Sequence, residues 1–200
     1  MQTLGLSSES KRSDGPLKSI FWPTVDNAWD VDYLGRQGLM ICTVVALFAV
    51  VPAIFIGNPV YIVASAVAAL LFLVGGMGVR EGSWLAAAMV FSLYIFDMLN
   101  VLAQGHIPGI LSIAAAGVLL SNLRAAYLAS HWKPAGPDED RPTRFNEGMM
   151  DFLIDQLPAK AWPALETSFF ALGAAFLALT LLGLGFTLWH RFGVLAHAQP

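Results

Sequence analysis

Five apolar segments, each close to twenty residues long or longer, most constrain what this chain can fold into. A helix rises about 1.5 Å per residue, so about twenty residues cross the roughly 30 Å hydrocarbon core of a bilayer. Of the 200 residues, 56% are hydrophobic and 12% are charged, whereas about a quarter are charged in an ordinary soluble domain. We therefore predict an all-α polytopic integral membrane protein with five spans: Gly38–Ile56, Pro59–Val79, Trp84–Ala103, Ile107–Ser130 and Ala164–Trp189.

The segments between the spans divide the chain into five parts. We predict a cytoplasmic tail at 1–37, a block of four transmembrane helices at 38–130, a cytoplasmic loop at 131–163, a fifth transmembrane helix at 164–189 and an outer tail at 190–200. Two residues separate the first span from the second, and three separate the third from the fourth. Connections this short join antiparallel neighbours, so each of these pairs should form a hairpin.

Aromatic residues alternate with aspartates just before the first span, from Ile20 to Tyr33. Aromatic side chains are enriched where membrane and water meet. We therefore expect this segment to lie at the headgroup level and to position the first span. A helix that docks on anionic lipid is typically rich in Lys and Arg, and this segment is acidic.

Positive charge is distributed unevenly about the five spans. Ten of the eleven Lys and Arg residues fall on the side that contains the N-terminus, and only Arg191 falls on the other side. Because cytoplasmic loops carry an excess of Lys and Arg, we predict a cytoplasmic N-terminus and a C-terminus outside. The charge bias and the lack of a recognisable targeting segment favour a bacterial inner (plasma) membrane.

The third span carries polar residues in its second half. Asp97 lies inside the apolar run, where an ionisable side chain costs about 2.5–3.5 kcal/mol on insertion scales. At about 100° per residue, Tyr94, Asn100 and Gln104 fall on the same third of the helix surface. We interpret the four residues as an interhelical hydrogen-bond network that specifies packing, with a proton or cation relay or a substrate contact as the alternative.

The fourth span carries a charged residue on a face of small residues. Gly117, Ser121 and Ala125 recur every four residues, a spacing that lets helix backbones approach closely. Arg124 lies on the same face as Gly117 and Ser121, and counting along the helices puts it too far in depth from Asp97 to pair with it. We expect its partners to be water or two carboxylates at the inner boundary: Glu81 and Glu166.

The loop between the fourth and fifth spans contains an amphipathic pattern that ends at Pro158. Its apolar residues recur at i, i+4, i+7 and i+8: Phe145, Met149, Phe152 and Leu153. Its acidic residues line the opposite side: Glu147, Asp151 and Asp155. This periodicity predicts a short cytoplasmic amphipathic helix. One interpretation is a docking face for a partner protein, and the one we favour is a helix that closes the inner mouth of its own bundle.

The sequence contains no recognisable catalytic constellation. Its four histidines occur singly and its serines lack the Gly-x-Ser-x-Gly elbow, which disfavours a zinc peptidase and a serine hydrolase. A net charge of −3 with dispersed Lys and Arg gives no nucleic-acid signal. We therefore predict no catalytic residues, no metal and no cofactor, and the lipid bilayer as the main partner.

These observations favour a non-catalytic multi-pass membrane protein that acts as an accessory or assembly partner of a larger membrane complex. Its partner would be another membrane protein or a second copy of the chain. The alternative is a small transporter or ion pathway that uses Asp97, and an intramembrane enzyme is the third hypothesis. Two further runs stand out as candidate signature segments: VREGSW after the second span and LLSNLRAAYL at the end of the fourth.

Overall fold

The computed structural model describes residues 18, 21–25, 28–131 and 149–197, and all regular structure in these ranges is helical. Five long helices follow one another along the chain: α2 (Ala28–Ile56), α3 (Pro59–Arg80), α4 (Trp84–Ala103), α5 (Ile110–Ser130) and α6 (Met149–His197). Each is long and apolar enough to cross a membrane. The predicted all-helical architecture with five membrane-length helices is thereby confirmed.

The local sequence explains where the middle helices begin and how the chain turns between them. α4 has the bounds predicted for the third span, and α3 is one residue longer than the second. The Asn58 side chain accepts hydrogen bonds from two backbone N–H groups in the first turn of α3, and the Ser83 side chain accepts one from Ala86 in α4. Gly57 has a φ of 70°, a left-handed conformation that lets the chain turn within two residues.

α2 and α5 begin at positions other than those predicted. α2 starts ten residues before the expected first span, and its first turns contain charged residues such as Asp32. An ion pair with Arg80 offsets the charge of this carboxylate, so these turns extend the helix rather than form a separate interfacial segment. α5 starts at Ile110, three residues later than expected, because Pro108 precedes it and does not continue a helix.

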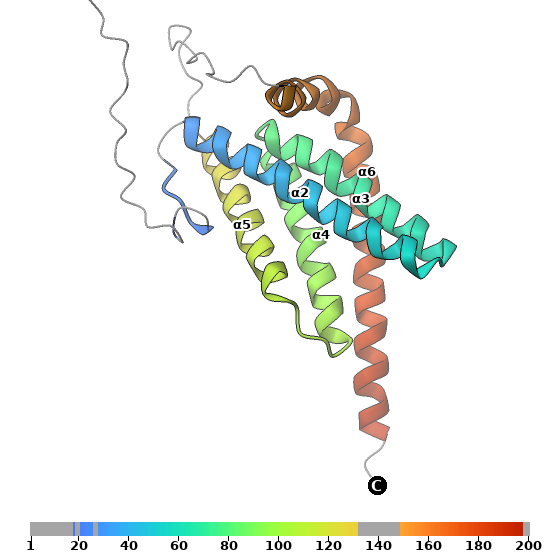
Figure 1. Cartoon of the computed structure of the whole chain (residues 1–200). Helices are drawn as coiled ribbons and strands as arrows, with labels where there is room; N and C mark the ends of the chain where they lie inside the picture. Colours follow the sequence, from blue (N-terminus) through green and yellow to red (C-terminus); the bar gives the residue numbers. More distant parts are fainter. Residues whose placement is uncertain (1–17, 19–20, 26–27, 132–148, 198–200) are drawn as a thin grey trace, which may run out of the picture.

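The separate amphipathic helix predicted between the fourth and fifth spans is not supported. Residues from Met149 onward form the first turns of α6, which continues through Pro158 and Pro163 to His197. Proline lacks an N–H group and clashes with the preceding turn, so it bends a helix that continues through it. Figure 1 shows the first turns of α6 running in a different direction from the rest of the helix. Phe145 and Glu147 lie outside the described residues, and so do five side chains of the predicted helix: Met149, Asp151, Phe152, Leu153 and Asp155.

The two hairpins cross each other and then diverge. α2 packs along α3, α4 packs along α5, and α6 packs on both α3 and α4. In Figure 1 the α2–α3 hairpin runs in a different direction from the α4–α5 hairpin, and the two tips lie far apart. Buried residues are concentrated in the second half of α3 and the first half of α4. The helices therefore pack most closely near the turn that joins α3 to α4.

Glycines in α3 make the closest contacts between helices. Gly76 faces α2, where an added Cβ would lie 2.8 Å from the Cβ of Cys42. Gly78 faces α4 and α6, where an added Cβ would lie 2.6 Å from the Cβ of Ala86 and 2.5 Å from Cη2 of Trp162. Cβ atoms in folded proteins essentially never lie within 3.0 Å of a non-bonded heavy atom, so an alanine would not fit at either position without a shift. The missing side chains therefore let three helices approach α3.

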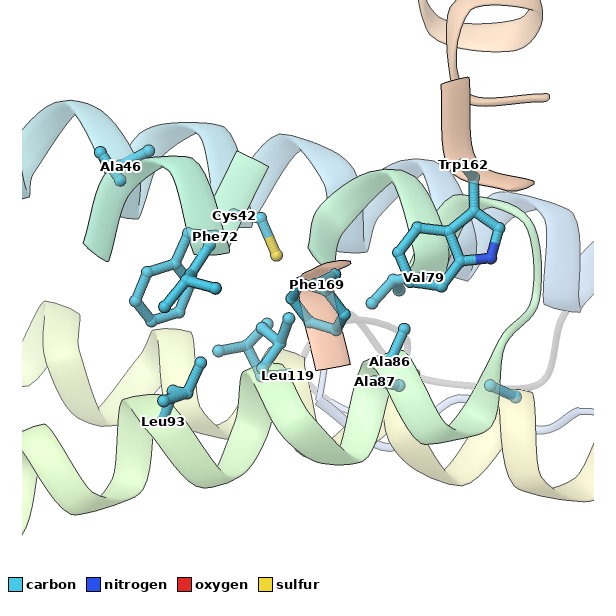
Figure 2. Packing of buried hydrophobic residues seen from close by; sticks show 14 residues of the cluster. Cys42, Ala46, Phe72, Val79, Ala86, Ala87, Leu93, Leu119, Trp162 and Phe169 are labelled. Atoms are coloured by element: carbon cyan, nitrogen blue, oxygen red, sulfur yellow. The ribbon is translucent and has the colours of Figure 1, made fainter. Parts of the chain in front are cut away.

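Aromatic side chains of α6 complete the core around these glycines. Trp162 and Phe169 are buried, and their ring centroids lie 5.5 Å apart in an edge-to-face arrangement. Figure 2 shows Phe169 pointing into the space between α3 and α4. The other helices contribute mostly small and aliphatic side chains to the same cluster: Cys42, Ala46, Val79, Ala86, Ala87, Leu93 and Leu119.

Gly78→Ala tests this packing directly. The added methyl group would overlap Trp162 and Ala86, so we expect the free energy of unfolding to fall by about 1–3 kcal/mol. Gly183→Ala is the matched control, because nothing lies within 4 Å of its added Cβ. Alanine also favours a helix over glycine, so the control should be neutral or stabilising by up to about 1 kcal/mol. Denaturant titration in detergent micelles, followed by circular dichroism, measures both changes; equal losses would contradict the packing described.

Candidate functional site

A partly buried ion pair joins α2 to the last turn of α3. Arg80 Nη1 lies 2.7 Å from Oδ1 of Asp32, and the Arg80 side chain is only 6% exposed. Arg36, one turn further along α2, places its Nε 3.3 Å from the other oxygen of the same carboxylate. The helices approach closely because Gly35 lies against the backbone of Arg80. The C-terminal end of α3 also favours a cation through the helix dipole, so Arg80 is held there by two attractions.

Buried polar atoms continue this site into the space between α2, α3 and α5. Gly38 lies where the three helices meet, since an added Cβ would be 2.5 Å from Val79 Cγ1 and 3.1 Å from Cγ of Asn122. Asn122 Nδ2 donates a hydrogen bond to the carbonyl one turn earlier, at 2.9 Å. Within the described ranges, Asn122 Oδ1 has no hydrogen-bond partner, and neither have Ser121 Oγ and Gln37 Oε1. Such atoms can accept hydrogen bonds from water or from a small polar ligand.

The two segments that stood out in the sequence meet at this point. The run VREGSW contributes Val79 and Arg80, and the run LLSNLRAAYL contributes Asn122. We call the group formed by Asp32, Arg36, Arg80 and Asn122 the polar junction. It combines one carboxylate, two guanidinium groups and an amide. Its one carboxylate is held by two guanidinium groups, so the polar junction suits binding by charge and hydrogen bonds or a structural role.

The segment before α2 packs on the small-residue face of α5. Arg124 Nη1 donates a hydrogen bond to the carbonyl oxygen of Pro23 at 2.8 Å, and its guanidinium lies 4.8 Å from the ring centroid of Trp22. Phe21 covers Gly117, with its Cδ1 atom 3.0 Å from the position of an added Cβ. The aromatic segment therefore covers the Gly117 end of the face predicted to bring helices together, while Ser121 and Ala125 of that face are buried.

The described contacts of Arg124 are with the segment before α2 and not with the two carboxylates named from the sequence. Glu81 and Glu166 are both exposed, and neither pairs with Arg124 in the part of the chain that the structure describes. The Pro23 carbonyl accepts its hydrogen bond, from 101 positions earlier in the sequence. No periodic pattern links residues so far apart, so only the folded chain reveals this contact.

The four polar residues of α4 share a face but are not joined by side-chain hydrogen bonds. Tyr94 donates its hydroxyl proton to the Ser112 carbonyl oxygen at 3.2 Å and so ties α4 to α5. Asp97 is exposed, Asn100 is half-buried, and Gln104 is exposed at the end of the helix. No described residue hydrogen-bonds to the Asp97 carboxyl group. Asp97 is therefore exposed and takes no part in a side-chain network among the described residues.

Arg191 forms a contact that the sequence did not reveal. Its Nη1 atom donates a hydrogen bond to the carbonyl oxygen of Ala103 at 2.6 Å, at the C-terminal end of α4. The guanidinium also lies beside Gly105, where an added Cβ would be 3.2 Å from Nη1. A cation at this position satisfies a carbonyl that the helix leaves unpaired and complements its dipole. The one signal in the sequence was the isolation of Arg191 beyond the last apolar span.

The described residues contain no group of three or more His, Cys, Asp and Glu side chains that could hold a metal ion. Comparison of the chain with protein-family models, curated proteins and solved structures gives no match. A functional interpretation therefore rests on the geometry and chemistry of the residues themselves.

Asp32→Asn tests whether the polar junction holds α2 on α3. The substitution removes the charge that lies closest to the buried Arg80 guanidinium, so we expect a loss of about 1–3 kcal/mol in the free energy of unfolding. Glu81→Gln removes the same charge from an exposed residue beside Arg80 and should change stability by less than about 0.5 kcal/mol.

A double-mutant cycle with Arg80→Gln completes this test. The double variant should be less destabilised than the sum of the single variants, because the pair is lost only once. Simple additivity of the two single losses, measured by the same unfolding titration, would show that the ion pair does not stabilise the fold.

Proposed function

We propose that the protein is a non-catalytic multi-pass membrane protein that acts as an accessory or assembly partner of a larger membrane complex. Its five helices of membrane-spanning length and their apolar surface support the membrane location. The most exposed side chains of these helices include large apolar residues: Phe48, Phe55, Ile110, Leu182 and Phe186. The asymmetry of Lys and Arg supports a cytoplasmic N-terminus in a bacterial inner membrane.

The accessory role rests on the exposure of Asp97. This residue lies on the face of α4 whose earlier residues are buried in the core. Ala86, Val90 and Leu93 lie on the same face of α4 and are buried. Asp97, one turn further along, is exposed, in the half of the helix from which the α2–α3 hairpin diverges (Figure 1). A carboxyl group at this depth of a bilayer requires a cation or a hydrogen-bond donor. The described part of the chain offers it none, so a helix of another membrane protein is the group's natural partner.

A transporter or ion pathway through Asp97 is the second candidate. The observation in its favour is that Tyr94 and Asn100 lie half-buried beside Asp97 on the same helix. A pathway within one chain needs its carboxylate to face the interior or a water-filled cavity. Because Asp97 is exposed on the flank of the bundle, the accessory role accounts better for its position.

Native mass spectrometry of the particle purified from its own membrane in a mild detergent tests the proposal. We expect a second membrane protein at fixed stoichiometry with the wild-type chain. Asp97→Leu should reduce the amount of this protein about tenfold or more, because a hydrogen bond to a charged group contributes on the order of 1.5–3 kcal/mol. Asp97→Asn, which keeps a hydrogen-bonding side chain, should retain more of it than Asp97→Leu.

Glu81→Gln is the matched control for this experiment, since it removes an exposed carboxylate near the turn between α3 and α4. The control should retain the partner at the wild-type level. A particle that contains only this chain, together with pH-dependent flux in proteoliposomes that Asp97→Asn abolishes, would reject the accessory role in favour of the pathway.

A further inference from the structure

An apolar groove lies between α4 and α6 beside the end of α4. Its lining is aliphatic except at one end: Leu99, Leu102, Ala103, Leu184, Leu188 and Arg191. Leu102 is 44% exposed and Leu188 is 37% exposed, so the groove is open to the surroundings of the bundle. A hydrocarbon chain fits such a lining, because it buries apolar surface and brings no polar group that needs a partner.

The guanidinium of Arg191 closes the polar end of the groove. One of its nitrogen atoms donates to Ala103, which fixes the group beside the end of α4. No carboxylate pairs with Arg191 within the ranges that the structure describes. A guanidinium has several further N–H donors and remains charged, so it can bind an anion while it keeps its contact with Ala103. Polar side chains line the space on the other side of Arg191: Gln104, Thr187 and His190.

An exposed tryptophan indicates the depth of this end of α6 in a bilayer. Trp189 is 79% exposed, and it lies two residues before Arg191 at the end of the apolar stretch of α6. Exposed tryptophan at the end of a span is typical of the headgroup level, and arginine at a helix end reaches the same level. The aliphatic lining and the guanidinium therefore lie at the depths where acyl chains and headgroups meet.

We infer that this groove binds an anionic phospholipid, with one acyl chain between Leu102 and Leu188 and the phosphate on Arg191. The planar guanidinium can donate two parallel hydrogen bonds to phosphate oxygens. A protein would have to bring both an apolar ridge and an anionic group at matching depth to occupy the groove, whereas every anionic phospholipid carries both. The inference goes beyond the accessory role and does not depend on it.

Competition between two lipids in native mass spectrometry tests the site. The full chain in detergent is mixed with equal concentrations of dioleoyl phosphatidylglycerol, which is anionic, and dioleoyl phosphatidylcholine, which is zwitterionic. We expect one bound lipid per chain, with phosphatidylglycerol preferred about fivefold, as one well-placed cation would provide. Arg191→Gln should abolish the preference, and Arg191→Lys should retain most of it.

Two further variants separate lipid binding from general effects of charge and folding. Lys160→Gln removes the same charge from an exposed position near the other end of α6 and should keep the fivefold preference. Leu184→Trp fills the groove and leaves Arg191 in place, so it should lower retention of both lipids. Equal binding of the two lipids by the wild type, a preference that survives Arg191→Gln, or a dimer of the chain with no bound lipid would each overturn the inference.

Discussion

The close approach of three helices to the glycines of α3 is the constraint on which the rest of the structure depends. Cys42 of α2 packs against Gly76, and Ala86 of α4 and Trp162 of α6 pack against Gly78. In a bilayer no hydrophobic force drives apolar helices together, so their association relies on packing and hydrogen bonds. The glycines lie in the second half of α3, which places the buried core near the turn between α3 and α4.

Polar contacts reinforce this end of the bundle and leave the opposite halves of the hairpins apart. The ion pair between Asp32 and Arg80 ties α2 to α3, and Arg124 ties the segment before α2 to α5. Toward the hairpin tips the α2–α3 pair diverges from α4 (Figure 1). Asp97 is exposed there, and Arg191 fixes α6 to the end of α4. The features proposed to contact a protein and a lipid thus lie in the halves where the chain covers itself least.

Elements defined by local sequence could be predicted, and features that depend on distant residues could not. The bounds of α4 follow from an apolar run and the Ser83 cap, and the all-helical class follows from five such runs. The early start of α2 depends on a partner of Asp32 that lies 48 positions away. Pro158 suggested the end of a helix, yet α6 continues through it to the buried Trp162 and Phe169. Asp97 was recognisable as a charge in an apolar span, but its exposure depends on how the hairpins diverge.

The accessibility of position 97 in a bilayer tests the central claim, that the core closes at one end and opens at the other. A nitroxide label is attached through Asp97→Cys or Leu93→Cys in a Cys42→Ala background, which removes the single buried cysteine. Power-saturation electron paramagnetic resonance of the reconstituted protein then measures contact with oxygen and with a water-soluble nickel complex. A mobile label that one of these two reagents reaches is expected at position 97, and an immobile label that neither reagent reaches is expected at position 93. Equal protection at both positions would contradict the claim.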